Sequence, residues 1–383
     1  MLDSKEIQEL SYFRKELHQY PELSGEESQT AKKVVTFLKQ CNPSQIITSV
    51  GGHGVVAIFD SEKEGFSVLF RADMDALPIQ ETNTFKHRST IEGVSHKCGH
   101  DGHTTMLLGL AKILSKKAPK SGKAILLFQP AEEIGDGATA VLNDKKFSSL
   151  KPDWVFGLHN LPGYPLHEVV VKKDSFTASV TSIVIDLNGK TTHAAEPEHG
   201  INPAIAVSEL ILQASLWSNN LPEKKDFTVI TPIYIELGNE AYGTSAGDAT
   251  LGFTIRTWTE DEMKKVKENF EKFLLAVAKK HKLRLHFKYI QEFKANENNT
   301  EAVESIITAA KSLNLKVSER KIPFKWGEDF GLFTQQYKGA FFGIGAGEGC
   351  PALHNPDYDF PNELLPTGSK MFYELCKNYL ACP

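Results

Sequence analysis

Short apolar runs alternate with amphipathic segments along the first part of the chain, and this alternation restricts the fold more than any other feature. Four runs have the length and composition of buried strands, and apolar residues recur at helical spacing between them. Strands that alternate with helices favour an α/β sheet with helices on both faces. The predicted strands cover residues 54–59, 66–70, 124–128 and 154–158, and the predicted helices cover 7–17, 24–38 and 104–114, the second capped at Ser24–Glu27.

The pattern changes after about residue 176, where a second arrangement begins. Its order is β-α-β-β-α-β, which is typical of a ferredoxin-like unit. The strands are expected at 180–187, 227–237, 249–258 and 283–289, and the helices at 203–217 and 261–279. Alternating helices and strands resume from Asn299. We therefore predict two domains, an α/β domain with a helix-flanked mixed sheet from residues 1–176 and 292–383, and an inserted α+β domain at 177–291.

Composition and charge exclude several classes of protein. A chain of 383 residues suits two domains, and its formal net charge of -5 with a pI near 6.2 gives no electrostatic reason to expect nucleic acid or an anionic membrane as partner. No apolar run approaches the roughly 20 residues that span a bilayer, and the N-terminus lacks the basic and apolar regions of a signal peptide. Five irregularly spaced cysteines indicate a reducing compartment. We expect a soluble cytoplasmic protein.

The segment His96–His103 is the richest in metal-binding side chains. Thiolate and imidazole are the ligands that zinc and other late first-row metals prefer. Cys98 and His100 can point at one ion if the loop is extended, because residues i and i+2 then face the same way. On its own this pair could also be half of a structural zinc site, or simply part of a polar loop.

Further donors follow predicted strands. Glu132 and Glu133 come just after the strand at 124–128, and His159 follows the strand at 154–158. The carboxyl ends of strands are where α/β sheets place their active sites, and two adjacent acids at such an edge need a positive partner, for which a metal ion is suited. His354, far downstream, completes the set of donors.

Taken together, these motifs resemble the bacterial and plant N-acyl-amino-acid amidohydrolases, a group that includes hippurate hydrolases, indole-acetyl-amino-acid hydrolases and N-acetyl-diaminopimelate deacetylases. The resemblance covers essentially the whole chain. It implies a zinc-peptidase-like catalytic domain with two metal ions and an inserted lid or dimerisation domain. The matching segments are residues 71–78, 96–104, 129–133, 157–162, 193–195 and 354–360.

The resemblance also implies roles for single residues. It assigns Glu132 as the general acid and base and His193, in the inserted domain, as a donor to the scissile carbonyl oxygen. In dimeric relatives that histidine can come from the partner subunit. The implied metal ligands are Cys98, His100, Glu133, His159 and His354.

Other polar residues are expected to support the site. We expect Asp73, Asp75, Asp101 and His103 to orient ligands rather than bind metal, although loop capping accounts equally well for each one singly. Arg256 can grip a substrate carboxylate, and Glu328 is a candidate substrate contact or supporting residue.

We predict hydrolysis of the amide bond of N-acyl amino acids by a metal-activated water, with two divalent ions per chain. Manganese or zinc is expected, and cobalt or nickel also suits the ligands. The substrate stays open, because the run Gly243–Ala246 stands where much of the family has Asn-Val-Ile-Pro. A dipeptidase or aminopeptidase-type metallopeptidase is the enzymatic alternative, and a non-catalytic metal-stabilised binding protein is the remote one. The protein is expected as a monomer or as a homodimer through the inserted domain.

Overall fold

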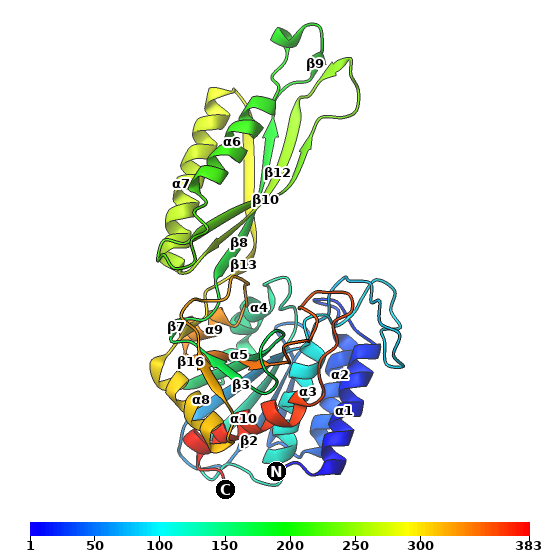
Figure 1. The fold of residues 1–383 in the computed structure, drawn as a ribbon, viewed down its shortest axis with the longest axis vertical. Helices are drawn as coiled ribbons and strands as arrows, with labels where there is room; N and C mark the ends of the chain where they lie inside the picture. Colours follow the sequence, from blue (N-terminus) through cyan, green and yellow to red (C-terminus); the bar gives the residue numbers. More distant parts are fainter. The chain divides into compact units, whose positions relative to one another are not determined.

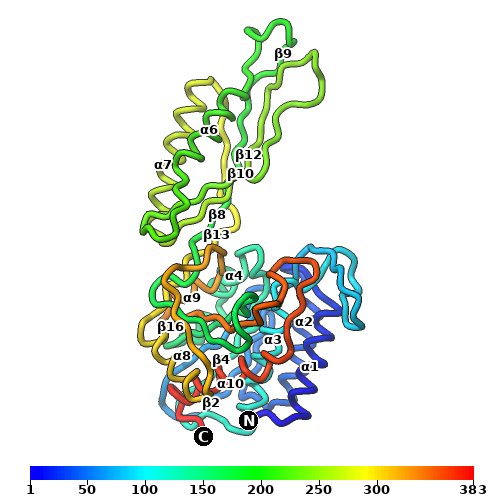
Figure 2. The backbone as a smooth tube through the Cα atoms, viewed as in Figure 1, coloured from blue at the N-terminus to red at the C-terminus, as the bar shows by residue number.

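The computed structural model describes residues 1–383, which divide into two compact units. The first unit consists of residues 1–176, 296–321 and 328–383, and the second of residues 177–295 and 322–327. Figure 2 follows the chain out of the first unit, through the second and back. The second unit therefore extends past residue 291, the predicted end of the insert, and also takes in a short later segment.

An eight-stranded mixed sheet forms the centre of the first unit, in the order β1-β2-β4-β3-β5-β16-β6-β15. The neighbours β4, β3, β5 and β16 all run parallel, whereas β1 and β2 form an antiparallel edge. The strands are β1 Gln45–Val50, β2 Gly54–Asp60, β3 Ser67–Asp73, β4 Lys123–Gln129, β5 Trp154–Leu161, β6 Val169–Val171, β15 Val317–Glu319 and β16 Lys338–Gly345.

Side chains on both faces of this sheet are buried, which explains why its strands are continuous apolar runs. Phe70 and Phe342 contact Phe372 on one face, whereas Phe341, next in the chain to Phe342, contacts Phe330 on the other. Figure 1 shows α1, α2 and α3 side by side, and both α1 and α2 contact α3. The helices are α1 Ser4–Gln19, α2 Ser28–Gln40, α3 His100–Leu114, α4 Gly137–Asn143, α5 Lys145–Ser148, α8 Thr300–Ser312, α9 Gly331–Gln336 and α10 Leu364–Leu380.

The predicted cap of the second helix is wrong. Helix α2 begins at Ser28 rather than Ser24, and Glu27, at its N-cap, makes no capping hydrogen bond with its side chain. The carboxylate of Glu22 accepts the backbone N–H groups of Gln29 and Thr30 instead. In no helix are the length and apolar character sufficient for a membrane crossing.

The second unit has the predicted ferredoxin-like order and topology. Its antiparallel sheet has the spatial order β10-β12-β8-β13, so that the first strand lies in the middle and the last at an edge. From Thr181 onward the side chains of β8 alternate between buried and half-buried, as expected of a sheet whose core lies on one face. Its elements are β8 Ser179–Asn188, α6 Ala204–Trp217, β10 Thr228–Leu237, β12 Asp248–Thr257, α7 Glu260–Lys280 and β13 Arg284–Phe293, with the short strands β9 Thr192–His193 and β11 Thr244–Ser245 and a 3-10 turn at Pro197–His199.

The two ends of the insert are held together by the first unit. Strand β7 (Asp174–Ser175) pairs antiparallel with β14 (Glu297–Asn298). The N–H of Phe176 also donates to the carbonyl of Asn296. The chain therefore leaves the first unit after residue 176 and returns to it at residue 296 beside one two-stranded ladder, and the segment 322–327 is a second, short excursion.

Candidate metal centre

The predicted donors of the first unit meet at the carboxyl ends of its parallel strands. Strand β4 leads into the loop that carries Glu132 and Glu133, and the chain beyond β16 carries His354. His159 lies within β5 rather than after it, opposite Gly343 of β16. Because β4, β3, β5 and β16 are parallel neighbours, these segments share one edge of the sheet.

Cys98 and His100 reach the same edge by a turn, not by the extended loop that we expected. Gly99 between them has a φ of +96° and is the N-cap of α3, so His100 is the first residue of that helix. A Cβ at this glycine would lie 2.5 Å from the Oδ1 atom of Asn160. Glycine is therefore required both by the left-handed backbone and by the close approach.

The structure brings the five predicted metal ligands together. The ligand atoms of Cys98, His100 and His159 lie within 4.8 Å of one another, as do those of Cys98, Glu133 and His354. The two groups share the thiol, whose Sγ is 3.4 Å from the Nε2 of His159. A third group joins His100 to both glutamates. Overlapping sets of this kind are what two neighbouring cations need, and metal binding by these residues stays a prediction.

The donor atoms fit a cation on chemical grounds. His100 Nε2 and Glu133 Oε1 are buried and have no hydrogen-bond partner. Burial and repulsion from neighbouring acids raise the pKa of Glu133 to about 7. Burial, followed by the two glutamates, also raises the pKa of the Cys98 thiol. A divalent cation would satisfy the orphaned atoms and favour the deprotonated ligands.

Asp75 contacts two of these predicted donors. One carboxylate oxygen lies 3.0 Å from the Nδ1 of His100. The other accepts the N–H of Glu133 at 2.9 Å and the hydroxyl of Ser24 at 2.7 Å. The Nε2 of His100 is thereby turned towards the cluster. Ser24, expected as a helix cap, instead belongs to the surroundings of the site.

Asp73 and His103 form a second supporting pair. The Nδ1 of His103 lies 2.7 Å from Asp73, and its Nε2 lies 2.5 Å from the Oδ1 of Asn160. The backbone carbonyl of Asn160 accepts a hydrogen bond from the Nδ1 of His159. The amide nitrogen of Asn160 donates to the hydroxyl of Tyr358. Asn160 had no role in the sequence prediction, although it lies in a motif segment, and Tyr358, which the sequence offered as a possible lining residue of an acyl pocket or as core, is buried.

Asp101 contacts helix α1, whereas we expected it to orient a metal ligand. Its carboxylate lies 2.9 Å from the Nδ1 of His18 and 3.3 Å from the guanidinium of Arg14, both in α1. These partners hold the pKa of Asp101 below its ordinary range, against the effect of burial. Asp101 therefore ties α3 to α1, and its carboxylate is directed to these cations rather than to a predicted ligand.

Glu132 is buried beside the donor cluster. The residue is 5% exposed, one carboxylate oxygen lies 3.9 Å from the Nε2 of His100, and the other lies 3.4 Å from the backbone nitrogen of Asp329. Burial is the main reason why its pKa is raised well above the ordinary value, and repulsion from Glu328 and Asp329 adds to it. A carboxyl group held in this way is suited to carry a proton near neutral pH.

Arg71 is a central residue that sequence reasoning left without a role. Its guanidinium donates to Gln129, Asp73 and Asp329 at 2.7–2.9 Å, and it lies 3.0 Å from Glu328. All four partners are buried with it. An arginine inside an otherwise apolar strand was the available signal, because a buried guanidinium requires several acceptors.

Glu328 lies inside the protein rather than on an open surface, and its role stays a prediction. It is 1% exposed and its carboxylate is occupied by Arg71. The structure favours the second of the two roles that the sequence left open for it.

The two predicted residues of the second unit lie apart from each other in it. His193, in β9, is exposed and lies opposite Thr244 of β11, so the divergent run Gly243–Ala246 is beside it. The N–H of Ala195 donates to its Nδ1, which leaves Nε2 as the donor atom. Arg256, in β12, donates to the carbonyl of Lys325. Their roles towards substrate remain predictions.

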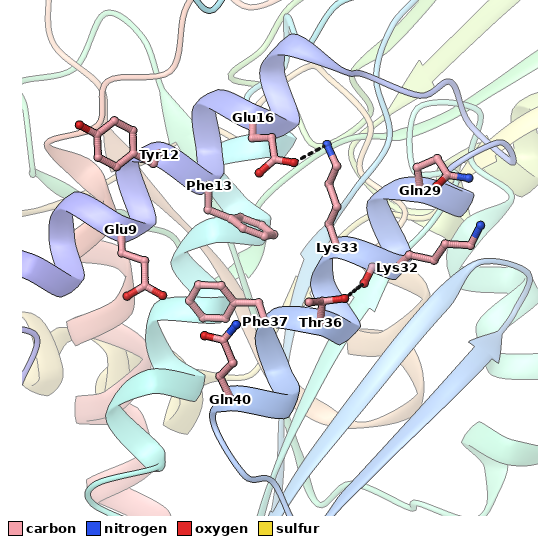
Figure 3. A pocket seen from close by; sticks show the side chains of 10 residues that line it. All are labelled: Glu9, Tyr12, Phe13, Glu16, Gln29, Lys32, Lys33, Thr36, Phe37 and Gln40. Atoms are coloured by element: carbon pink, nitrogen blue, oxygen red, sulfur yellow. Dashed lines mark hydrogen bonds and ion pairs between the residues drawn. The ribbon is translucent and has the colours of Figure 1, made fainter.

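A separate hollow lies between α1 and α2, with a volume of about 450 Å³. Figure 3 shows Phe13 and Phe37 facing each other there and Lys33 paired with Glu16. It contains none of the metal-donor residues and is therefore not part of the candidate centre. Its lining consists of Glu9, Tyr12, Phe13, Glu16, Gln29, Lys32, Lys33, Thr36, Phe37 and Gln40.

Comparison with known families decides the family of the chain. The model described as peptidase family M20/M25/M40 matches residues 69–378. The chain belongs to this family. The resemblance drawn from the motifs and the predicted class, a metal-dependent amidohydrolase, are thus confirmed at the level of the family.

Two relatives of this M20/M25/M40 member are similar to it in sequence over nearly its whole length. An N-acetyl-L-cysteine deacetylase of Bacillus subtilis is 33% identical over 374 residues, covering 96% of this chain and 87% of the relative. A hippurate hydrolase of Campylobacter jejuni is 32% identical over 377 residues and covers 97% of both chains.

A solved structure confirms the fold. It is that of the Bacillus subtilis protein YXEP, described as a dinuclear metal binding peptidase from the M20 family. The two structures superpose with a TM-score of 0.82 at 28% identity, over 97% of this chain and 98% of the other. The predicted helix-flanked mixed sheet with a separate antiparallel domain is the fold of this family.

Proposed function

We propose that the protein hydrolyses the amide bond of N-acyl amino acids, with two divalent metal ions held by Cys98, His100, Glu133, His159 and His354. The observation that carries the proposal is the position of Glu132, a buried carboxyl group with a raised pKa beside these five donors. A metal site with a purely structural role has no need of a second acid at that place.

The names of the relatives support the class of substrate. N-acetyl-L-cysteine and hippurate are both N-acyl amino acids, and both relatives align over nearly the whole chain. Cations bound in the cluster would act as Lewis acids that lower the pKa of a water and polarise the scissile carbonyl. Manganese or zinc is the proposed metal, since both accept thiolate, imidazole and carboxylate ligands.

The residues of the chain have distinct roles in this proposal. Glu132 accepts a proton from the attacking water as the new C–O bond forms, and it returns that proton to the amine nitrogen as the C–N bond breaks. His193 donates its Nε2–H to the carbonyl oxygen, where negative charge develops. Arg71, Asp73 and Asp75 hold the acids and His100 in place.

A substrate screen tests the proposal. We expect turnover of hippurate or of N-acetyl amino acids by the protein loaded with manganese or zinc, loss of turnover after chelation, and recovery when the metal is restored. Release of free amino acid is the measurement, and dipeptides are the comparison substrates. Turnover of dipeptides alone would favour the metallopeptidase alternative, and absence of turnover with every metal and substrate would favour the non-catalytic one.

We also propose a homodimer through the second unit. Helix α6 presents Ile205, Leu212 and Leu216 at 62–79% exposure, and the adjacent edge strand β10 presents Ile233 and Ile235. An unpaired edge strand beside an exposed apolar helix face is a surface that another chain usually covers. His193 of the same unit would then serve the site of its own chain or of the partner.

Analytical ultracentrifugation measures the oligomeric state and so tests this prediction. Leu216→Glu is expected to convert the dimer to a monomer, because the charge would be buried in the interface. Leu275→Glu is the matched control, since Leu275 is also exposed but lies on α7. A wild-type protein that sediments as a monomer at micromolar concentration contradicts the proposal.

A further inference from the structure

We infer that Glu27 is a positioning residue for the loop Ala131–Glu133, and this inference rests on the function proposed above. Glu27 lies at the start of α2, more than a hundred positions before that loop in the chain. Its side chain makes no cap for its own helix. One carboxylate oxygen instead accepts the backbone N–H of Ala131 at 2.8 Å.

The backbone at Ala131 explains why such a contact is needed. Its φ is +54°, in the left-handed region that residues with a Cβ seldom adopt. Ala131 follows the end of β4 and directly precedes Glu132. A conformation of this kind persists only where its surroundings fix it. The N–H of Ala131 is fixed by Glu27, and its carbonyl accepts the N–H of Gly137 at 3.0 Å.

The burial of Glu27 indicates that its carboxylate is retained for this contact. The residue is 0% exposed, and its Oε2 has no hydrogen-bond partner. Its Oε1 accepts a second N–H, from Gly25, at 2.9 Å. Burying a carboxylate costs free energy that these two bonds only partly offset. If this position had only a packing role, an apolar side chain of similar size would stabilise the fold more than a buried carboxylate.

Loss of the hydrogen bond between Glu27 and Ala131 is expected to affect the position of Glu132 more than that of Glu133. The N–H of Glu133 has its own anchor in Asp75, at 2.9 Å. The side chain of Glu132 has only a long contact with the N–H of Asp329, at 3.4 Å. The backbone carbonyl of Glu132 accepts the N–H of Gly135 at 2.8 Å, but no short hydrogen bond holds the side chain, so a rotation at Ala131 would displace the carboxyl group. Displacement of a reacting group by about 1 Å can lower a rate by about 100-fold.

Two conservative substitutions distinguish the effect of the length of the Glu27 side chain from the effect of its negative charge. In Glu27→Gln the amide oxygen can accept both N–H groups, and the amide nitrogen replaces an oxygen that has no partner. Glu27→Asp keeps the charge, but its side chain is one methylene too short to reach Ala131. We expect kcat to fall about 10-fold or more in Glu27→Asp, with KM and metal content unchanged, and to stay within about threefold of wild type in Glu27→Gln.

Glu22→Ala is the matched control. Its carboxylate also lies at the start of α2, but it binds the N–H groups of Gln29 and Thr30 in that helix. This variant is expected to lower the melting temperature while kcat stays unchanged. An equal loss of kcat in Glu22→Ala and Glu27→Asp, an equal loss in Glu27→Gln and Glu27→Asp, or no loss in Glu27→Asp would each overturn the inference.

The same assay distinguishes this inference from the proposed function. If Glu132→Ala is inactive while Glu27→Asp is fully active, Glu27 has no positioning role and the proposed base stands. If Glu132→Ala retains wild-type turnover, the proposed function itself fails, and the inference fails with it.

Discussion

Glu132→Ala is expected to lower kcat about 100-fold to 10,000-fold while the protein still binds its full complement of metal. The loss corresponds to removal of the group that moves the proton between the water and the leaving amine. Metal binding should persist because Cys98, His100, Glu133, His159 and His354, the five predicted ligands, all remain in this variant. Turnover of an N-acyl amino acid and elemental analysis of the metal-loaded protein are the two measurements.

The neighbouring residue provides the control for this prediction. Glu133→Ala removes a predicted ligand whose carboxylate lies 3.7 Å from both His100 and His354. We expect it to lose metal as well as activity. Loss of metal from Glu132→Ala, or turnover in that variant equal to wild type, would contradict the roles assigned to the two glutamates.

Arg71→Met is expected to destabilise the first unit by about 3–5 kcal/mol. The substitution leaves Asp73, Glu328 and Asp329 buried without their common cation, and removal of one partner from a buried ion pair has a cost of this size. The effect of Arg71 on these acids is visible in Asp329, where burial and Glu328 raise the pKa to about 8 even though the guanidinium lowers it. Loss of the guanidinium would leave that repulsion uncompensated.

Denaturant unfolding followed by tryptophan fluorescence measures this effect, because Trp154 lies in β5 of the first unit. Arg71→Lys keeps the charge but loses the planar fork, and should have an intermediate unfolding midpoint. Arg88→Met is the control at an exposed arginine. An unfolding midpoint for Arg71→Met as high as that of Arg88→Met would show that the buried network contributes nothing to stability.

The sequence allowed the elements to be predicted because they depend on local patterns, whereas the full set of ligands was implied by the resemblance to a known family. Apolar runs marked the central strands, and the ends of the predicted strands marked Glu133 and His159, although β5 in fact continues past His159 to Leu161. The partners of Arg71 could not be predicted in the same way, since Asp329 lies 258 positions away and only the packed sheet brings the two together.

Local patterns gave a wrong prediction where a side chain could bind either a neighbour in the sequence or a group from elsewhere in the fold. Serine is a residue type that often caps helices, yet the hydroxyl of Ser24 donates to Asp75, which lies just after β3. Asp101 lies in a donor-rich motif, but Arg14 and His18 of α1 engage its carboxylate. In both cases a charged group from elsewhere in the fold offers a stronger hydrogen bond than the local one.

The ladder between β7 and β14 has a consequence for how the chain folds. Pairing these two short strands closes a loop that contains the whole of residues 177–295. The entropy lost on closing a loop grows only with the logarithm of its length, so that doubling the loop costs about 0.6 kcal/mol more. The intervening segment can therefore change greatly in length over evolution at little expense to the larger unit.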